Sequence, residues 1–147
     1  MSRRVVIAGG GTGGHIFPGL AVARELKERE IDVHWLGARR GLEAELVAER
    51  NIPITLVDLE GIQSMTPSAA ARALAKLPGA VTTSVRTLLK LRPLIGVVGV
   101  GGYASTAGMM AAGLLGVPTV LQEQNSIPGK VNKFLAPFSD LICCGFE

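Results

Sequence analysis

The sequence predicts an α/β fold in which helices cover both faces of a doubly wound parallel sheet. Short runs of β-branched residues alternate with longer segments of helical periodicity, a pattern typical of βαβ units. Glycine-rich turns follow the first and the fourth of these runs. Since crossovers between parallel strands are right-handed, the expected strand order is 3-2-1-4-5, with room for a sixth strand at the end. We therefore expect a Rossmann-like sheet, and 147 residues fit one domain that spans 1–147.

The strands are placed by short apolar runs at 4–8, 32–36, 54–57, 94–98, 119–122 and 141–144. The first helix is expected at 18–30, where Leu20, Ala23 and Leu26 share one face and charged residues lie on the other. Pro18 suits the first turn of that helix. The other helices are expected at 42–50, 69–77, 81–91, 106–115 and 129–135.

The stretch 94–121 contains 28 residues without a charge, and a hydropathy scan could assign it to a membrane span. Seven glycines and Pro118 interrupt it, however, and divide it into strand, loop, helix and strand. A buried βαβ unit explains the same apolarity, and this is our interpretation.

The cysteines and the N-terminus argue against export. Cys143 and Cys144 are adjacent, which is poor geometry for a disulfide and favours a reducing, cytoplasmic setting. The apolar run after Arg4 ends at Gly9, too early for the core of a signal peptide.

The net charge of +3 comes from one part of the chain. Residues 1–60 and 123–147 each carry a net charge of −1, whereas 61–122 has five basic residues and no acid. The five are Arg72, Lys76, Arg86, Lys90 and Arg92. Together with apolar neighbours such as Leu74 and Leu77, they indicate a surface that touches an anionic leaflet. A solvated helix face is the alternative, and nucleic acid fits less well because no RNA-binding motif accompanies the charge.

The first glycine motif, GGGTGGH, runs from Gly9 to His15 between a strand and a helix. Free N–H groups at the start of such a helix, together with its dipole, favour an anion, and the expected guest is a phosphate. The motif also satisfies the dinucleotide fingerprint, but the second strand ends without a carboxylate for a ribose. A Walker loop is excluded because His15 and Ile16 stand where Lys and Ser or Thr are needed. A tight turn without a ligand is the alternative.

The second glycine motif runs from Gly99 to Ser105 and repeats the order of strand, glycine loop and helix on the neighbouring strand. Two helix N-termini could then converge on one ligand. A diphosphate, with two anionic groups, matches two such loops. A close contact between helix and sheet that requires glycine is the alternative.

Two residues are candidate bases. The helix dipole disfavours an imidazolium at His15, which suits a base for a sugar hydroxyl, although a loop-bracing histidine is the alternative. Glu123 follows the fifth strand within Gln122-Glu123-Gln124-Asn125, a set of side chains suited to hydrogen bonds with a sugar or peptide. Its carboxylate can equally bind N–H groups of its own loop. His34, within a strand, is expected to be structural.

These motifs, in this order, resemble the MurG family of bacterial N-acetylglucosaminyltransferases, which belongs to glycosyltransferase family 28. The resemblance covers the whole chain, through GGGTGGHIFPGLAVARELKE, HWLGARRGLEAELV, GVGGYASTAGMMAA and GVPTVLQEQNSIPGKVNKFLA. It implies the N-terminal half of a GT-B fold, with the active cleft between two Rossmann-like domains. It also implies inverting transfer of N-acetylglucosamine from UDP-N-acetylglucosamine to the muramoyl 4-hydroxyl of lipid I, which gives lipid II, without a metal or other cofactor.

The resemblance assigns roles to residues of this chain. The acceptor diphosphate is expected at Thr12, Gly13, Gly14, Gly101, Gly102 and Tyr103. The donor sugar is expected at Thr12, Gly13, Gly14 and Asn125, while His15 assists the acceptor and Glu123 is the second catalytic candidate. The membrane-facing patch corresponds to Arg72, Leu74, Lys76, Leu77, Arg86 and Lys90, which implies a peripheral protein at the cytoplasmic face of the bacterial inner membrane.

Two departures from the family pattern matter. Gln122 stands where a histidine is usual, so no role of that side chain carries over. The sequence stops at Glu147, before the second domain that holds most nucleotide contacts, and we expect a fragment that binds acceptor or membrane without turnover. Two other hypotheses stay open: a nicotinamide-dinucleotide-binding domain of an oxidoreductase, and a non-catalytic membrane adaptor that pairs with a separate donor-binding chain.

Overall fold

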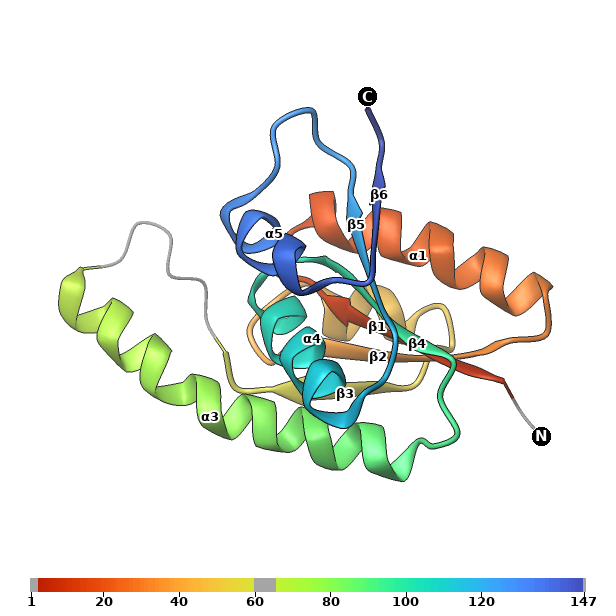
Figure 1. The fold of residues 1–147 in the computed structure, drawn as a ribbon, viewed down its shortest axis with the longest axis horizontal. Coiled ribbons are helices and arrows are strands. Elements are labelled where there is room, and N and C mark those ends of the chain that lie inside the picture. The colour runs from red at the N-terminus through yellow and green to blue at the C-terminus, as the bar shows by residue number, and fades with distance from the viewer. Residues whose placement is uncertain (1–2, 60–65, 147) are drawn as a thin grey trace.

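A computed structural model describes residues 3–59 and 66–146, which form one parallel sheet in the order β3-β2-β1-β4-β5-β6 (Figure 1). The expected order of the first five strands is confirmed, and the sixth strand pairs with β5. The strands are β1 (Arg4–Gly9), β2 (Asp32–Ala38), β3 (Ile54–Val57), β4 (Gly96–Gly101), β5 (Thr119–Glu123) and β6 (Leu141–Cys144). The strand order reverses between β1 and β4, at the centre of the sheet.

Helices cover both faces of the sheet and enclose two apolar cores. They are α1 (Gly13–Glu28), α2 (Glu43–Ala48), α3 (Pro67–Lys90), α4 (Tyr103–Leu115) and α5 (Lys130–Leu135), followed by a 3-10 turn at Ala136–Phe138. The core under α1 and α2 contains Ile7, whereas the core under α3, α4 and α5 contains Val6 and Ala8. Because successive residues of a strand face opposite sides, a strand buried on both faces is apolar throughout.

Trp35 fixes the end of β1 from within the core beneath α1. Its ring is fully buried and lies against Gly19, where a Cβ would come within 2.5 Å of the ring. Its indole Nε1–H donates to the carbonyl of Gly9 at 2.9 Å. The buried polar end of the tryptophan thus anchors the residue at which the first glycine loop begins.

The first helix begins at Gly13, earlier than the start at Pro18 that the sequence pattern predicts. Pro18 lies in the second turn and has no N–H, so it cannot bond to the carbonyl of Gly14 four residues earlier. The side-chain amide of Gln124 donates to that carbonyl instead, at 2.7 Å. The gap in the helical ladder therefore becomes a link between α1 and the loop after β5.

The separate helices expected at 69–77 and 81–91 are wrong, because α3 is continuous through Pro78 and Gly79. Figure 1 shows it as one long helix beside α4. Its buried residues, Ala73, Ala80, Ser84 and Leu88, continue at helical spacing across the proline. Packing against the sheet and α4 thus outweighs the local tendency to break.

The uncharged stretch 94–121 forms β4, α4 and β5, as expected for a buried βαβ unit. Gly108 allows α4 to approach β1, since a Cβ there would lie 2.5 Å from the Cβ of Ala8. None of the helices in the described ranges has both the length and the apolarity needed to cross a bilayer.

Candidate functional site

Two glycine loops touch at the carboxyl ends of β1 and β4, where the strand order reverses. The N–H of Gly10 donates to the carbonyl of Gly101 at 3.2 Å. Gly102 has a φ of +78°, and a Cβ there would overlap the carbonyl of Gly10. Glycine satisfies both the backbone conformation and this close contact. The two motifs therefore form one surface, at the edge where sheets of this type bind ligands.

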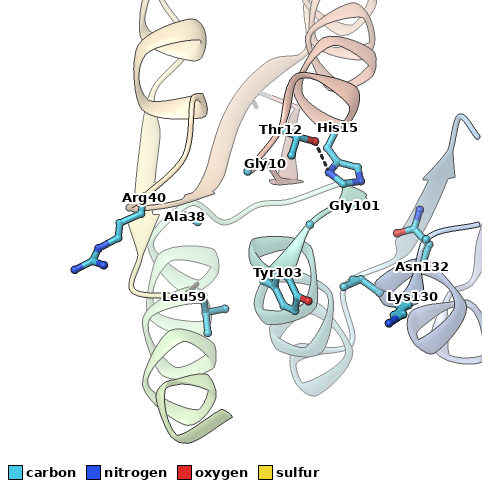
Figure 2. A pocket seen from close by; sticks show the side chains of 14 residues that line it. Gly10, Thr12, His15, Ala38, Arg40, Leu59, Gly101, Tyr103, Lys130 and Asn132 are labelled. Carbon is cyan, nitrogen blue, oxygen red and sulfur yellow. Dashed lines mark hydrogen bonds between the residues drawn. The ribbon is translucent and has the colours of Figure 1, made fainter. Parts of the chain in front are cut away.

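A cavity of about 290 Å³ opens beside these loops (Figure 2). Its wall consists of Gly10, Gly11, Thr12, His15, Ala38, Arg40, Leu59, Gly101, Gly102, Tyr103, Gly129, Lys130, Val131 and Asn132. Of the residues predicted from the sequence, Thr12, His15, Gly101, Gly102 and Tyr103 are in this wall. The remaining predicted catalytic and ligand-binding residues, Gly13, Gly14, Glu123 and Asn125, lie outside it.

Two cations of the cavity wall escaped prediction from the sequence. Arg40 follows β2, and Lys130 is the first residue of α5. Figure 2 shows them on opposite sides of the cavity, with Tyr103 between them. The pair Arg39-Arg40 directly after a strand was a usable signal, because ligands bind at that edge of the sheet. With the first turns of α1 and α4, these cations favour an anionic guest.

His15 is half-buried in the first turn of α1, where its ring contacts Thr12 and Gly101. Its Nδ1 lies 3.2 Å from Thr12 Oγ1 (Figure 2). Its ring rests against Gly101, where a Cβ would overlap the imidazole. Thr12 precedes the helix as its N-cap, yet its hydroxyl bonds to His15 rather than capping a backbone N–H. The imidazole of the first glycine motif therefore packs directly against the backbone of the second.

Glu123 is buried, and its carboxylate is the hydrogen-bonding centre of the loop after β5. Oε1 accepts the N–H and the side-chain amide of Asn125, and Oε2 accepts the N–H of Gly129 and the amide of Asn132, all at 2.9–3.0 Å. Burial by itself raises the pKa of Glu123, but these donors stabilise the anion and leave its pKa below the ordinary value. This arrangement favours the loop-bracing interpretation, because such a carboxylate accepts a proton poorly at neutral pH.

Asn125 and Gln124 lie at the exposed end of the same loop. Asn125 is exposed, and its backbone N–H and one side-chain N–H donate to Glu123. These bonds leave its side-chain oxygen and its second amide N–H for a ligand. Gln124 reaches across to Gly14. Gln122 contributes its carbonyl, which accepts from Asn132. Among the described residues, no three side chains of His, Cys, Asp or Glu are grouped to hold a metal ion.

The residues predicted to face a membrane all lie on α3. Arg72, Arg86 and Lys90 are exposed, and Arg86 and Lys90 border a hollow that they share with His34 of β2 and Thr55 of β3. Lys76 is half-buried and forms an ion pair with Asp58 at 3.2 Å. The side chains of Leu74 and Leu89 are 56% and 48% exposed, so apolar surface accompanies the cations. Leu77 is half-buried against the core.

A second, apolar cavity of about 270 Å³ adjoins the first. Its wall consists of Leu59, Ala73, Leu74, Leu77, Tyr103, Thr106, Lys130, Val131 and Phe134. Leu59, Tyr103, Lys130 and Val131 belong to both walls. A polar, cationic cavity and an apolar one therefore lie side by side, with α3 along the apolar one.

The sequence profile of the glycosyltransferase family 28 N-terminal domain matches residues 5–143. The chain belongs to this family. The family 28 chain is 44% identical, over all of its length, to a protein of Syntrophus aciditrophicus (strain SB) named UDP-N-acetylglucosamine--N-acetylmuramyl-(pentapeptide) pyrophosphoryl-undecaprenol N-acetylglucosamine transferase, and covers 41% of it. It is 40% identical, over 99% of its length, to the protein of the same name from Pseudomonas paraeruginosa (strain DSM 24068 / PA7), and again covers 41%. The family 28 chain thus spans about two fifths of the length of these curated relatives.

Solved structures confirm the fold. The crystal structure of Acinetobacter baumannii MurG matches this family 28 domain with a TM-score of 0.85 at 33% identity, over 100% of this chain and 42% of that one. UDP-GlcNAc 2-epimerase from Methanocaldococcus jannaschii matches with a TM-score of 0.64 at 20% identity, over 98% of this chain and 39% of that one, and shares the fold alone. The Rossmann-like sheet expected for the N-terminal half of a GT-B enzyme is thereby confirmed, and the nicotinamide-binding alternative is left without support.

Proposed function

We propose that this domain binds the acceptor in an inverting N-acetylglucosaminyl transfer of peptidoglycan synthesis. The sugar passes from UDP-N-acetylglucosamine to the muramoyl 4-hydroxyl of lipid I and gives lipid II. The relatives from Syntrophus and Pseudomonas carry this donor sugar and a pyrophosphoryl-undecaprenol in their names. The observation that carries the proposal is the cavity where both glycine loops, two helix starts and two cations meet.

The diphosphate of the acceptor is proposed to lie against the paired loops. The first N–H groups of α1, at Gly13 and Gly14, have no acceptor within the helix, and the same holds for Tyr103 at the start of α4. These donors, with the helix dipoles, favour a phosphate at each loop. Arg40 and Lys130 add charge from either side. Two anionic groups on one ligand match this doubled arrangement better than one does.

The polyprenyl chain of the acceptor is proposed to leave through the apolar cavity. That cavity begins at Tyr103 and Lys130, which also border the cationic one, and it extends to Leu74 and Leu77 on α3. A ligand with a diphosphate joined to an isoprenoid chain presents the same sequence of polar and apolar groups. Leu74 and Leu77 of the membrane-facing patch then lie where the chain emerges. The location that goes with this proposal is peripheral, at the cytoplasmic face of the inner membrane.

His15 is proposed to take the proton of the acceptor hydroxyl. The tautomer in which Nδ1–H donates to Thr12 Oγ1 leaves a lone pair on Nε2, and the ring stands in the cavity wall. A neutral imidazole with a free lone pair is the form that a general base requires. Thr12 is then a positioning residue that selects the tautomer.

Donor binding and turnover are proposed to need a second domain. Thr12, Gly13, Gly14 and Asn125 lie on one edge of this domain, and the bonds of Asn125 to Glu123 use its N–H groups and not its side-chain oxygen. A donor-binding domain facing this edge would close the cleft, with residues 1–147 as the acceptor-binding domain.

Calorimetric titration of this chain with a short-chain lipid I analogue and, separately, with UDP-N-acetylglucosamine and NADH tests the proposal. We expect saturable binding of the lipid analogue and no measurable binding of the two nucleotides. Inorganic pyrophosphate serves as a control for the headgroup alone and should bind more weakly, because it does not fill the apolar cavity. A prenol without phosphate is a second control, for the apolar part alone. Tight binding of NADH, or equal affinity for this prenol and the lipid analogue, would contradict the proposal.

A further inference from the structure

Glu43, the first residue of α2, is fully buried, yet the proposed reaction makes no use of its carboxylate. Its Oε2 accepts the N–H of Gly11 at 2.9 Å, and its Oε1 accepts the N–H of Ala38 at 2.6 Å. Gly11 belongs to the first glycine loop and Ala38 ends β2, and both are in the wall of the cationic cavity. One carboxylate therefore joins two separate parts of that wall from beneath.

Three glycines make room for this carboxylate. A Cβ at Gly10, Gly37 or Gly41 would overlap atoms of the Glu43 side chain. Gly10 comes from the loop, Gly37 from β2 and Gly41 from the turn before α2. A charged group is costly to bury unless its surroundings supply hydrogen bonds, and here backbone N–H groups supply them. Loop, strand and turn are thus shaped around a single side chain.

We infer that Glu43 is a positioning residue that fixes the conformation of residues 10–12 and, through them, the start of α1. Gly10 and Gly11 have φ angles of +150° and +92°, and a loop of glycines has many other conformations open to it. Trp35 holds the loop at Gly9 and Gly101 holds it at Gly10. Glu43 supplies the next contact, at Gly11, directly before the helix cap. A loop that is already ordered in the free protein loses less conformational entropy when a ligand binds, and this favours binding.

The consequence for binding rests on the proposed function, whereas the conformational claim does not. The bound diphosphate would meet a loop whose Gly11 N–H is already engaged by Glu43, directly before the unpaired N–H groups at the start of α1. Loss of the Glu43 contact should therefore weaken binding without removing any group that touches the ligand.

Two variants test the inference. Glu43→Gln keeps the shape of the side chain but replaces one acceptor oxygen by a donor, so one of the two backbone N–H groups loses its partner. Gly41→Ala places a methyl group against Glu43 Oε2, the oxygen that binds Gly11, and leaves the loop sequence intact. Gly41 has no positive φ, so its backbone accepts alanine. In the ligand-free chain, hydrogen exchange should be at least about tenfold faster at Gly11 in Gly41→Ala, and at Gly11 or Ala38 in Glu43→Gln, according to which N–H keeps the remaining oxygen. Farnesyl diphosphate should bind about tenfold more weakly to both.

Two controls separate positioning from general stability. Glu45→Gln removes the same charge from the exposed side of α2 and should change neither measurement. Leu88→Ala leaves a cavity in the core beneath α3 and lowers the stability of the fold without touching the loop. Hydrogen exchange in this variant should rise across the core and not selectively at Gly11.

Unchanged exchange at Gly11 in Gly41→Ala, unchanged exchange at both Gly11 and Ala38 in Glu43→Gln, or the same exchange pattern in Leu88→Ala, would overturn the inference. So would wild-type affinity for farnesyl diphosphate in a Glu43→Gln chain whose loop exchange has risen. If the wild-type chain binds no farnesyl diphosphate while exchange follows the expected pattern, the proposed function fails and the positioning role of Glu43 stands.

Discussion

The role of His15 can be predicted from the sequence, whereas that of Glu43 cannot. His15 ends a glycine motif between a strand and a helix, and that pattern is sufficient to predict a residue at the ligand-binding edge. Glu43 accepts hydrogen bonds from Gly11 and Ala38, and only folding brings Gly11, 32 positions earlier in the chain, to it. In sequence it is one acid among several at the start of an amphipathic helix. A side chain that accepts hydrogen bonds from distant backbone N–H groups has no characteristic sequence pattern, so this role of Glu43 is visible in the fold alone.

The proposed role of His15 predicts a loss of turnover that exceeds the loss of acceptor affinity. In a chimera where residues 1–147 replace the matching part of Acinetobacter baumannii MurG, His15→Ala should lower kcat by about a hundredfold or more, the range for a general base, with a smaller change in acceptor KM. Thr12→Val should lower kcat as well, whereas Thr12→Ser, which keeps the hydroxyl, should retain most activity. Unchanged kcat in His15→Ala would remove it from the catalytic residues.

The lowered pKa of Glu123 predicts how stability depends on pH. Because the folded chain lowers the pKa of this carboxyl below its ordinary value of 4.5, the unfolded chain binds a proton first as the pH falls. The contribution of Glu123 to the free energy of unfolding is thus complete above about pH 4.5 and decreases below it.

Glu123→Gln should therefore unfold more easily at pH 7, by about 1–3 kcal/mol, because one pair of donors, either the two N–H groups of Asn125 or those of Gly129 and Asn132, loses its acceptor. The difference from wild type should narrow at pH 3.5, as measured by urea unfolding. A difference that stays constant between these pH values would show that ionisation of Glu123 contributes nothing to stability.

At the scale of helices and strands, the two largest errors of sequence prediction both concern proline. Pro18 predicts a helix start and Pro78 a helix break, yet α1 begins one turn earlier and α3 runs through. In α1 the unpaired Gly14 carbonyl finds Gln124, and in α3 the buried face continues past the proline. Both outcomes depend on contacts with distant segments, which local propensity does not contain.

The link between α1 and the loop after β5 predicts an energetic coupling. In the wild-type background, Gln124→Leu should lower the free energy of unfolding by about 1 kcal/mol, the usual net value of one hydrogen bond. In a Pro18→Ala background the helix can supply its own N–H to Gly14, so the same change should cost less. Chemical unfolding of the four proteins gives the coupling energy of this cycle, and a value near zero would contradict the proposed link.

The exposed cations of α3 predict electrostatic attachment to membranes. Replacing Arg72, Arg86 and Lys90 by Gln should weaken binding to vesicles rich in anionic lipid by about 3 kcal/mol, at about 1 kcal/mol per cation, with no effect on neutral vesicles. A control with the same charge change on the other side of the sheet replaces Arg24, Arg29 and Arg50. If sedimentation shows equal losses for both triple variants, α3 is an ordinary solvated face.

At the scale of the whole molecule, the alternation of apolar runs and helical segments was sufficient to predict the parallel sheet and its strand order. That order places both glycine loops at one edge, and this is why the sequence could locate the site. Arg40 could have been placed at this edge from its position after β2, but Lys130 and Asn132 could not, because the packing of α5 brings them into the cavity wall. Topology brings the loops together, and tertiary packing decides which other side chains join them.

The central claim is that the two touching glycine loops hold one diphosphate between them. Titration of the isotopically labelled chain with farnesyl diphosphate, followed by NMR of the backbone amides, tests it most directly. The account predicts saturable shifts of the amides of both loops with one common dissociation constant, and no such shifts with farnesol. These amides are Thr12, Gly13, Gly14, Gly101, Gly102 and Tyr103. Saturable binding that leaves the amides of both loops unchanged would contradict it.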